Sequence, residues 1–217
     1  MKKNHYEAYI PVAKAYSSND PAHDYLHVFR VFKNGQTLLK KEPEADGDIV
    51  LTAILLHEVF NFPKGHPMSS KSGDICSLLA GQLLEEHHFN PEKIPRVMDC
   101  IKNHSFSKGI IPATIEEKIV QDADRLDAIG AIGIARCFAT SADMKRPFYD
   151  SQDPFAQNRE LDDKNFCMDH FYKKLLKLGD AMHTPAARLM AEERIRFMHS
   201  YLDQLSEELS LIQTNLI

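Results

Sequence analysis

The sequence predicts an all-α protein, and three observations support this fold class. Apolar residues recur at helical spacing along most of the chain, helix-start signals precede several of these segments, and no segment sustains the two-residue alternation of a half-buried strand. Hydrophobic residues make up 43% of the 217 residues, enough to build a substantial core. We therefore expect one helical domain over residues 1–217, with its core at about residues 20–140.

The first half of the chain predicts four helices. They are residues 22–40, 49–57, 69–86 and 91–103. The second begins after Asp46 or Asp48 and is apolar nearly all round, so we expect it in the middle of the protein. Residues 61–67 contain two prolines and a glycine and predict a loop. Asn90 is a capping residue followed by a proline at the first helical position, which starts the fourth helix.

The second half predicts one long helix, a long loop and two more helices. Residues 114–117 form a capping box, which opens a helix running towards residue 138. Gly130 and Gly133 fall inside that helix and are expected to let another helix approach closely. Residues 140–163 are polar, contain two prolines and predict a loop or lid. The last two helices are expected at residues 165–178 and 185–209.

Charge, cysteine usage and hydropathy narrow the class of protein. A net charge of -5 and a pI near 6.1 argue against a dedicated nucleic-acid surface. The four cysteines show no close pairing typical of a zinc or redox motif, so we expect reduced, mostly buried thiols. No apolar run is long enough to span a membrane, and none near residue 1 suits export. These features predict a cytoplasmic protein with no membrane partner.

Two predicted helices place carboxylates where a partner is required. In the helix from residue 115, Asp127 falls within the apolar face and Asp124 at its edge. Such a carboxylate needs a metal, a cation or several hydrogen-bond donors; the alternative is that Asp127 caps a neighbouring backbone segment. The apolar helix from residue 49 ends in His57 and Glu58. We expect these two ionisable groups either to bind a ligand or to be solvated at a helix end that reaches the surface.

Two further histidine clusters have the same ambiguity. His23 and His27 are four residues apart, so both can reach one metal or one anion, although such pairs also occur by coincidence on surfaces. His104 ends a predicted helix, where it caps that helix or joins the other clusters. Neutral imidazoles with carboxylates suit Mn, Fe, Ni, Co or Zn. A metal held in this way can activate water and polarise a phosphoryl oxygen, although spacing alone does not separate phosphate hydrolysis from other metal-dependent hydrolysis.

These clusters, in this order, resemble the HD-domain phosphohydrolases. The superfamily pattern is a histidine, a His-Asp dipeptide in a second helix and a distant aspartate, and His27, His57 with Glu58, and Asp124 correspond to it. A bacterial subgroup is matched more closely by residues 23–31, 104–107 and 120–136. The similarity runs from about residue 20 to about residue 205. It implies an all-α HD-domain helical bundle, one divalent metal (Mn, Mg, Co, Ni, Fe or Zn) and a nucleotide or related phosphate compound as substrate. Nucleoside triphosphate pyrophosphohydrolysis is one activity of similar proteins.

The resemblance also implies roles for particular residues. His27, His57, Glu58 and Asp124 would hold the metal, and Glu58 or Asp124 would accept a proton from water. Asp127 would orient a histidine. His23 and His104 are candidates for binding the phosphates or protonating the leaving group, and Lys64 for neutralising a second phosphate. Arg30 and Lys174 are weaker candidates for substrate binding, and the alternative for each is a solvated helix face. The expected partner is this small phosphorylated substrate. A homodimer with a second copy of the chain is also open.

The sequence departs from the family pattern at Glu58, where the dipeptide has aspartate. Glutamate keeps the charge but adds one methylene, and metal distances are fixed within tenths of an ångström. Three outcomes are open: Glu58 ligates after a backbone shift, it acts through a water, or the protein is a catalytically impaired nucleotide- or alarmone-binding protein. An enzyme that acts on a non-nucleotide phosphoester is a further alternative.

Overall fold

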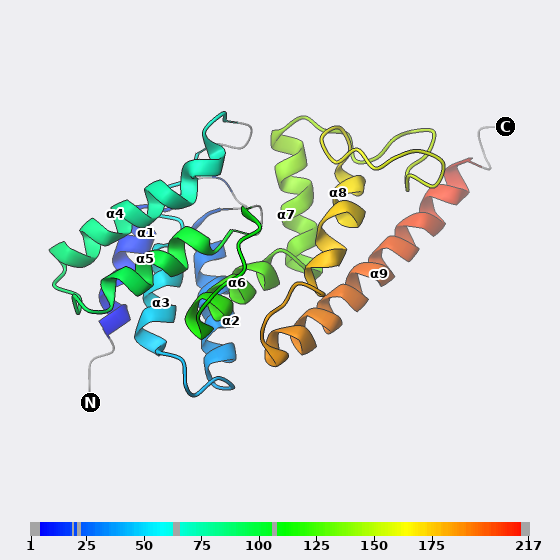
Figure 1. Cartoon of the computed structure of the whole chain (residues 1–217). Coiled ribbons are helices and arrows are strands. Elements are labelled where there is room, and N and C mark those ends of the chain that lie inside the picture. The colour runs from blue at the N-terminus through cyan, green and yellow to red at the C-terminus, as the bar shows by residue number, and fades with distance from the viewer. Residues whose placement is uncertain (1–4, 19, 21–22, 63–65, 106–107, 214–217) are drawn as a thin grey trace. The chain divides into compact units, whose positions relative to one another are not determined.

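Helices make up all the regular secondary structure of the described residues, which confirms the predicted all-α class (Figure 1). The computed structural model describes residues 5–18, 20, 23–62, 66–105 and 108–213. For residues 211–213 it describes the backbone only. Among these residues, no helix combines the length and hydropathy that crossing a membrane requires.

The chain forms two compact units, Met1–Asp127 and Ala128–Ile217, which we describe separately. Unit 1 contains η1 (His5–Tyr9), α1 (Ile10–Ala15), α2 (Tyr25–Leu39), α3 (Gly47–Leu56), η2 (Ser69–Lys71), α4 (Ser72–Glu86), α5 (Ile94–Asn103) and α6 (Ile115–Asp127). Unit 2 contains α7 (Gly130–Asp143), α8 (Cys167–Lys173), η4 (Leu175–Leu178) and α9 (Pro185–Gln213).

Helix α3 is the centre of unit 1, as its apolar sequence predicts. It packs against α1, α2, α5 and α6, and every residue from Ile49 to Leu56 is buried. Asp46 caps its N-terminus by accepting hydrogen bonds from the backbone N–H groups of Asp48 and Ile49. The buried helix therefore delivers its last residues, and His57 after them, into the interior of the unit.

The predicted start of α5 is wrong by three residues. The helix begins at Ile94 rather than at Pro91, and residues 91–93 form a turn. Pro95 has no N–H to donate to the carbonyl of Pro91, so one bond of a continuous helix through this region is missing. The signal at Asn90 is still used locally, because its side chain accepts a hydrogen bond from the N–H of Glu92.

The helix predicted from the capping box to residue 138 is divided into α6 and α7. Ile129 is extended, and Gly130 has a φ of 74°, which ends any helical path there. A Cβ on Gly133 would lie 2.3 Å from the carbonyl oxygen of Ala128, so only glycine permits this tight connection. A Cβ on Gly130 would approach Arg194 of α9 to 3.1 Å. The expected close approach of another helix is therefore found at Gly130, which faces α9. Gly133 instead faces Ala128, in the connection that precedes α7.

In unit 2, α7 packs against both α8 and α9. Helix α9 begins at Pro185 as predicted, and Thr184 accepts a hydrogen bond from the N–H of Ala187. The loop expected over residues 140–163 starts later, because α7 continues to Asp143 with Ser141 buried inside the unit. The helix predicted over residues 165–178 is likewise shorter, since Lys174 leaves helical geometry between α8 and η4.

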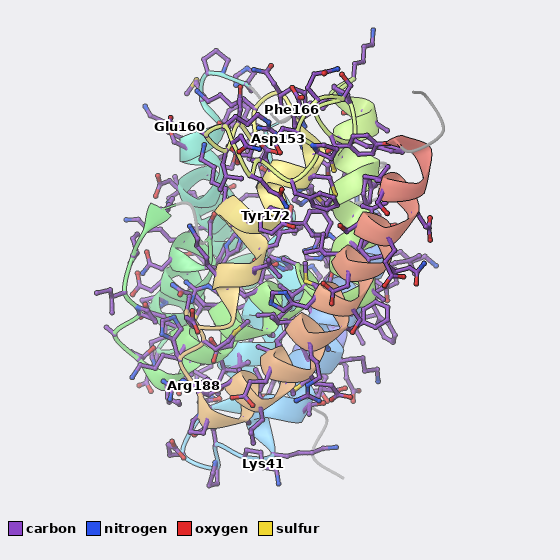
Figure 2. The ribbon with its side chains drawn as sticks, turned by 90° about the vertical axis from the view of Figure 1, so that its right-hand side faces the viewer. Lys41, Asp153, Glu160, Phe166, Tyr172 and Arg188 are labelled. Atoms are coloured by element: carbon purple, nitrogen blue, oxygen red, sulfur yellow. The ribbon has the colours of Figure 1, made fainter. Side chains whose placement is uncertain are left out.

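Carboxylates and arginines hold the long segment between α7 and α8 in place. Asp150 accepts hydrogen bonds from the N–H groups of Gln152 and Asp153, and Asp153 accepts them from Gln157 and Asn158. Arg159 forms two hydrogen bonds with the buried carboxylate of Asp169 in α8. Figure 2 shows Asp153, Glu160 and Phe166 gathered at one end of the unit. The segment is thus fixed by side-chain bonds, and its role as a lid stays a prediction.

Candidate metal centre

The N-terminus of α2 places His27 in the interior. Asp24 is the cap of this helix, and its side chain accepts a hydrogen bond of 2.8 Å from the backbone N–H of His27. His27 itself is buried. The His-Asp dipeptide at residues 23–24 therefore uses its aspartate to start a helix, while its histidine remains available for other contacts.

The C-terminal end of α3 orients His57. The ring Nδ1 lies 2.6 Å from the carbonyl oxygen of Ile54, one turn earlier in the same helix. A carbonyl can only accept, so Nδ1 carries the proton and Nε2 presents a lone pair. The side chain is buried, and this single backbone bond fixes both its ring plane and its tautomer.

Asp127 of α6 fixes the tautomer of His27 in the same way. Its Oδ2 lies 2.8 Å from Nδ1 of His27, and Arg30 donates two hydrogen bonds to this carboxylate at 2.7 and 3.1 Å. The bidentate guanidinium favours the ionised form of Asp127, so Nδ1 of His27 is the donor and, in the neutral ring, Nε2 carries no proton. The carboxylate that the sequence places in an apolar face is thus satisfied by one imidazole and one cation.

Three side chains from three helices converge in front of these rings. Nε2 of His27 lies 3.3 Å from Nε2 of His57 and 3.5 Å from Oδ1 of Asp124, and the His57–Asp124 distance is 4.0 Å. Two atoms that each lie about 2.1 Å from one cation are about 3.0–4.2 Å apart at ligand angles from 90° to 180°. All three separations fall within that span.

The chemistry of this donor set fits a divalent cation. When both imidazoles are neutral and protonated at Nδ1, neither Nε2 has a proton to donate across the 3.3 Å that separates them, so two lone pairs and a carboxylate oxygen face one another. Such an arrangement is repulsive unless a cation lies between the three atoms. Neutral imidazole and carboxylate groups suit Mn, Fe, Co, Ni or Zn.

Glu58 lies beside this group rather than inside it. Its Oε1 is 3.1 Å from Nδ1 of His23 and 4.0 Å from Nε2 of His27, and its Oε2 accepts a hydrogen bond from Asn61. Glu58, His23 and His27 form a second cluster in which ligand atoms lie within 4.8 Å of one another. Burial would raise the pKa of Glu58, but the hydrogen bond and charge of His23 and the two neighbouring imidazoles hold it well below its usual range.

His104 repeats the geometry of His57 at the end of α5. Its Nδ1 lies 2.6 Å from the carbonyl oxygen of Ile101, again three residues earlier, so its Nε2 is also without a proton in the neutral ring. The rings of His57 and His104 meet edge to face, with centroids 5.1 Å apart. The helix-end contact that the sequence suggested for His104 therefore coexists with a place beside the candidate metal centre.

Burial of His57 predicts a pH effect on the stability of the metal-free protein. Burial, opposed by Glu58 and aided by His104 and His27, lowers the pKa of His57 from 6.5 to about 4. Between these values the unfolded chain binds a proton that the folded protein does not, so stability is lost as the pH falls. We expect the free energy of unfolding to decrease by about 3 kcal/mol from this group. Urea denaturation from pH 7 to 4 measures it, and an unchanged pH slope in His57→Gln would contradict it.

The other predicted residues lie as follows. Arg30 is held by Asp127, so its guanidinium is already engaged within unit 1. Lys174 belongs to unit 2, at the end of α8. Lys64 lies outside the described residues. Asn61 was not predicted, although its position three residues after Glu58 was a usable signal.

Comparisons with known proteins agree with this geometry. The family model described as HD domain matches residues 24–129, which contain every residue of the cluster except His23. The uncharacterized protein YpgQ from Bacillus subtilis (strain 168) is 36% identical over 195 residues, which cover 86% of this chain and 84% of that protein.

Solved structures extend the likeness over nearly the whole chain. The crystal structure of Bacillus subtilis YpgQ in complex with ADP has a TM-score of 0.73 at 32% identity and covers 94% of both chains. An HD-superfamily hydrolase from Bacillus thuringiensis has a TM-score of 0.73 at 36% identity and covers 97% of this chain and 99% of its own. The chain therefore belongs to the HD-domain superfamily of hydrolases.

Proposed function

We propose that this protein is a metal-dependent phosphohydrolase that acts on a nucleotide and cleaves a phosphoester or phosphoanhydride bond. The observation that carries the proposal is the meeting of Nε2 of His27 and Nε2 of His57 with the carboxylate of Asp124. Each of these imidazoles is locked by a hydrogen bond on its other nitrogen, so the donor set is preorganised for a cation. Glu58, whose Oε1 lies 4.0 Å from Nε2 of His27, is the fourth proposed ligand, either after a backbone shift or through a water.

A divalent cation at this centre would supply Lewis acidity towards a phosphoryl oxygen and a water molecule. Asp124 is the residue that we assign to accept the proton from the water molecule, since a quarter of its side chain is exposed to solvent. Glu58 is a poor candidate for that step because its pKa is held low, and it serves better as a fixed negative charge. His104 and the partly exposed His23 would bind the phosphates or protonate the leaving group.

A nucleotide substrate is favoured by the relative that was crystallised with ADP. Within that class, the resemblance of residues 23–31, 104–107 and 120–136 to a bacterial subgroup in which nucleoside triphosphate pyrophosphohydrolysis is one activity suggests cleavage between the α- and β-phosphates. A binding protein without turnover is the alternative, and one contact favours it: the carboxylate of Glu58 is already satisfied by His23 and Asn61. The two functions differ in whether a product is released.

The test is a release assay with metal-stripped protein. The protein is reloaded separately with Mn, Co, Ni, Mg, Zn or Fe and given nucleoside triphosphates, diphosphates, monophosphates and sugar phosphates. We expect turnover of a nucleotide with at least one metal, with pyrophosphate as the product if the α–β bond is cleaved. Nucleotide binding without turnover would establish the binding protein, and turnover of sugar phosphates alone would overturn the nucleotide assignment.

Shortening Glu58 tests whether the departure from the family pattern impairs the site. In Glu58→Asp the carboxylate is drawn back and gives up its contacts with His23 and Asn61, so we expect a loss of turnover. A displacement of about 1 Å can cost about 100-fold in rate. Steady-state rates with the preferred metal measure the effect. A large gain in rate would instead mean that glutamate impairs the natural protein.

A further inference from the structure

The described part of the chain holds one pair of cysteine sulfurs in hydrogen-bond contact, and the proposed hydrolysis makes no use of it. Sγ of Cys137 in α7 lies 3.6 Å from Sγ of Cys167, the first residue of α8, and either sulfur can be the hydrogen-bond donor. Each thiol also points at the backbone carbonyl oxygen of the other residue, at 3.9 and 3.6 Å. Both residues belong to unit 2, and both are free thiols.

We propose that Cys137 and Cys167 form a redox modification site, in which a hydroperoxide oxidises the two thiols to a disulfide that links α7 to the start of α8. A disulfide bond is about 2.05 Å long, so the sulfurs need to approach by about 1.5 Å for the bond to form. The bond would enclose the segment between the two helices, since the cysteines are 30 residues apart.

The surroundings favour a thiolate at this pair. The hydrogen bond from Cys137 lowers the pKa of the Cys167 thiol, burial opposes this, and the Ser141 hydroxyl and the Arg146 guanidinium lower it further. Burial instead raises the pKa of Cys76 and of Cys100, which lie singly in unit 1. The thiolate is the nucleophile towards peroxides, so the chain contains one reactive pair and two inert thiols as internal controls.

The reaction balances in two steps. Proton transfer across the S–H···S contact places the thiolate on Cys137, which keeps 7% of its surface exposed whereas Cys167 keeps none. This thiolate attacks the peroxide oxygen, forms a sulfenic acid and releases hydroxide, which takes up the proton held by Cys167. The thiolate of Cys167 then attacks the sulfur of the sulfenic acid, forms the S–S bond and releases hydroxide, which takes up the proton that the pair gave to solvent when its thiolate formed. The two thiols lose two electrons and the hydroperoxide gains them.

The sequence allows a direct test because trypsin separates the four cysteines. The peptides that contain Cys76, Cys100, Cys137 and Cys167 are residues 72–93, 97–102, 137–145 and 165–173. The folded full-length protein is treated with hydrogen peroxide, free thiols are alkylated, and the digest is analysed by mass spectrometry. We expect peptides 137–145 and 165–173 to be joined and lighter by two hydrogen atoms. Cys76 and Cys100 should be oxidised at least tenfold more slowly.

Two matched variants complete the experiment. Cys137→Ser and Cys167→Ser should each abolish the joined peptide, and a reducing agent should restore both thiols in the natural protein. Because the main measurement is made on the natural protein, a variant that fails to fold does not affect it. Equal oxidation of all four cysteines, or a joined peptide that forms only in denaturant, would overturn the proposal. So would full alkylation of Cys137 and Cys167 after peroxide treatment.

Discussion

Replacing Asp124 by asparagine should lower metal affinity and turnover at least about 100-fold while leaving the fold intact. Asp124 supplies the carboxylate of the converging set, 3.5 Å from Nε2 of His27 and 4.0 Å from that of His57. An asparagine of the same size keeps an oxygen but loses the charge. It also brings N–H donors that can bond to the two imidazole nitrogens. The loss exceeds the 10- to 100-fold that is typical for supporting residues around a metal, because the ligand itself is removed.

Calorimetric titration of the metal-free protein with Mn²⁺ measures the affinity directly, and initial rates measure turnover. Asp99→Asn is the matched control, since it makes the same chemical change at an exposed position of α5 in the same unit. We expect the control to bind metal as the natural protein does. If Asp124→Asn binds Mn²⁺ within threefold of the natural protein, the cation is not held where we place it.

Replacing Asp127 by asparagine should weaken metal binding by about 10- to 100-fold although Asp127 does not itself face the centre. Its carboxylate accepts from Nδ1 of His27 and receives two hydrogen bonds from Arg30. The neutral amide would polarise the imidazole less and would leave the Arg30 cation without its counter-charge. Arg30→Gln should have the smaller effect, because the Asp127–His27 contact survives it.

The nitrogen chemical shifts of His27 in the metal-free protein report the tautomer, which a merely structural role would leave unchanged. A double-mutant cycle of Arg30→Gln and Asp127→Asn should show that the two losses are not additive. Asp163→Asn is the control, because it removes a carboxylate from a similar contact with His170 in unit 2. Metal affinity equal to that of the natural protein in Asp127→Asn would contradict the assigned positioning role.

Local sequence signals predicted most of the helices, and they failed where distant or unusual contacts decide. The apolar run of α3 and the Thr184-Pro185 start of α9 were sufficient because each helix needs only its own residues to begin. The division between α6 and α7 was missed because the pattern of apolar residues continues through Gly130. What ends the helix there is a left-handed backbone and the contact of Gly133 with a carbonyl oxygen, neither of which has a periodicity.

For the candidate site, the spacing of residues in the sequence identified the candidates but could not tell which role each one has. Asp124 and Asp127 are three residues apart on one helix, yet only Asp124 reaches the nitrogens that face each other. The partner that separates them is Arg30, which lies 97 residues away in sequence from Asp127. Glu58 similarly finds His23 across 35 residues. Contacts between residues so far apart in the sequence follow from the packing of α2 against α3 and α6, so they become visible only in the folded chain.

The carboxylate of Asp153 binds two main-chain N–H groups, those of Gln157 and Asn158, in a stretch that forms no helix. Amide protons held in this way should exchange with heavy water slowly, as those of a helix do. An exchange map would then mark part of this irregular stretch as protected. Substituting asparagine for Asp153 should release both protons together, which would show that a single side chain takes the place of a helical turn.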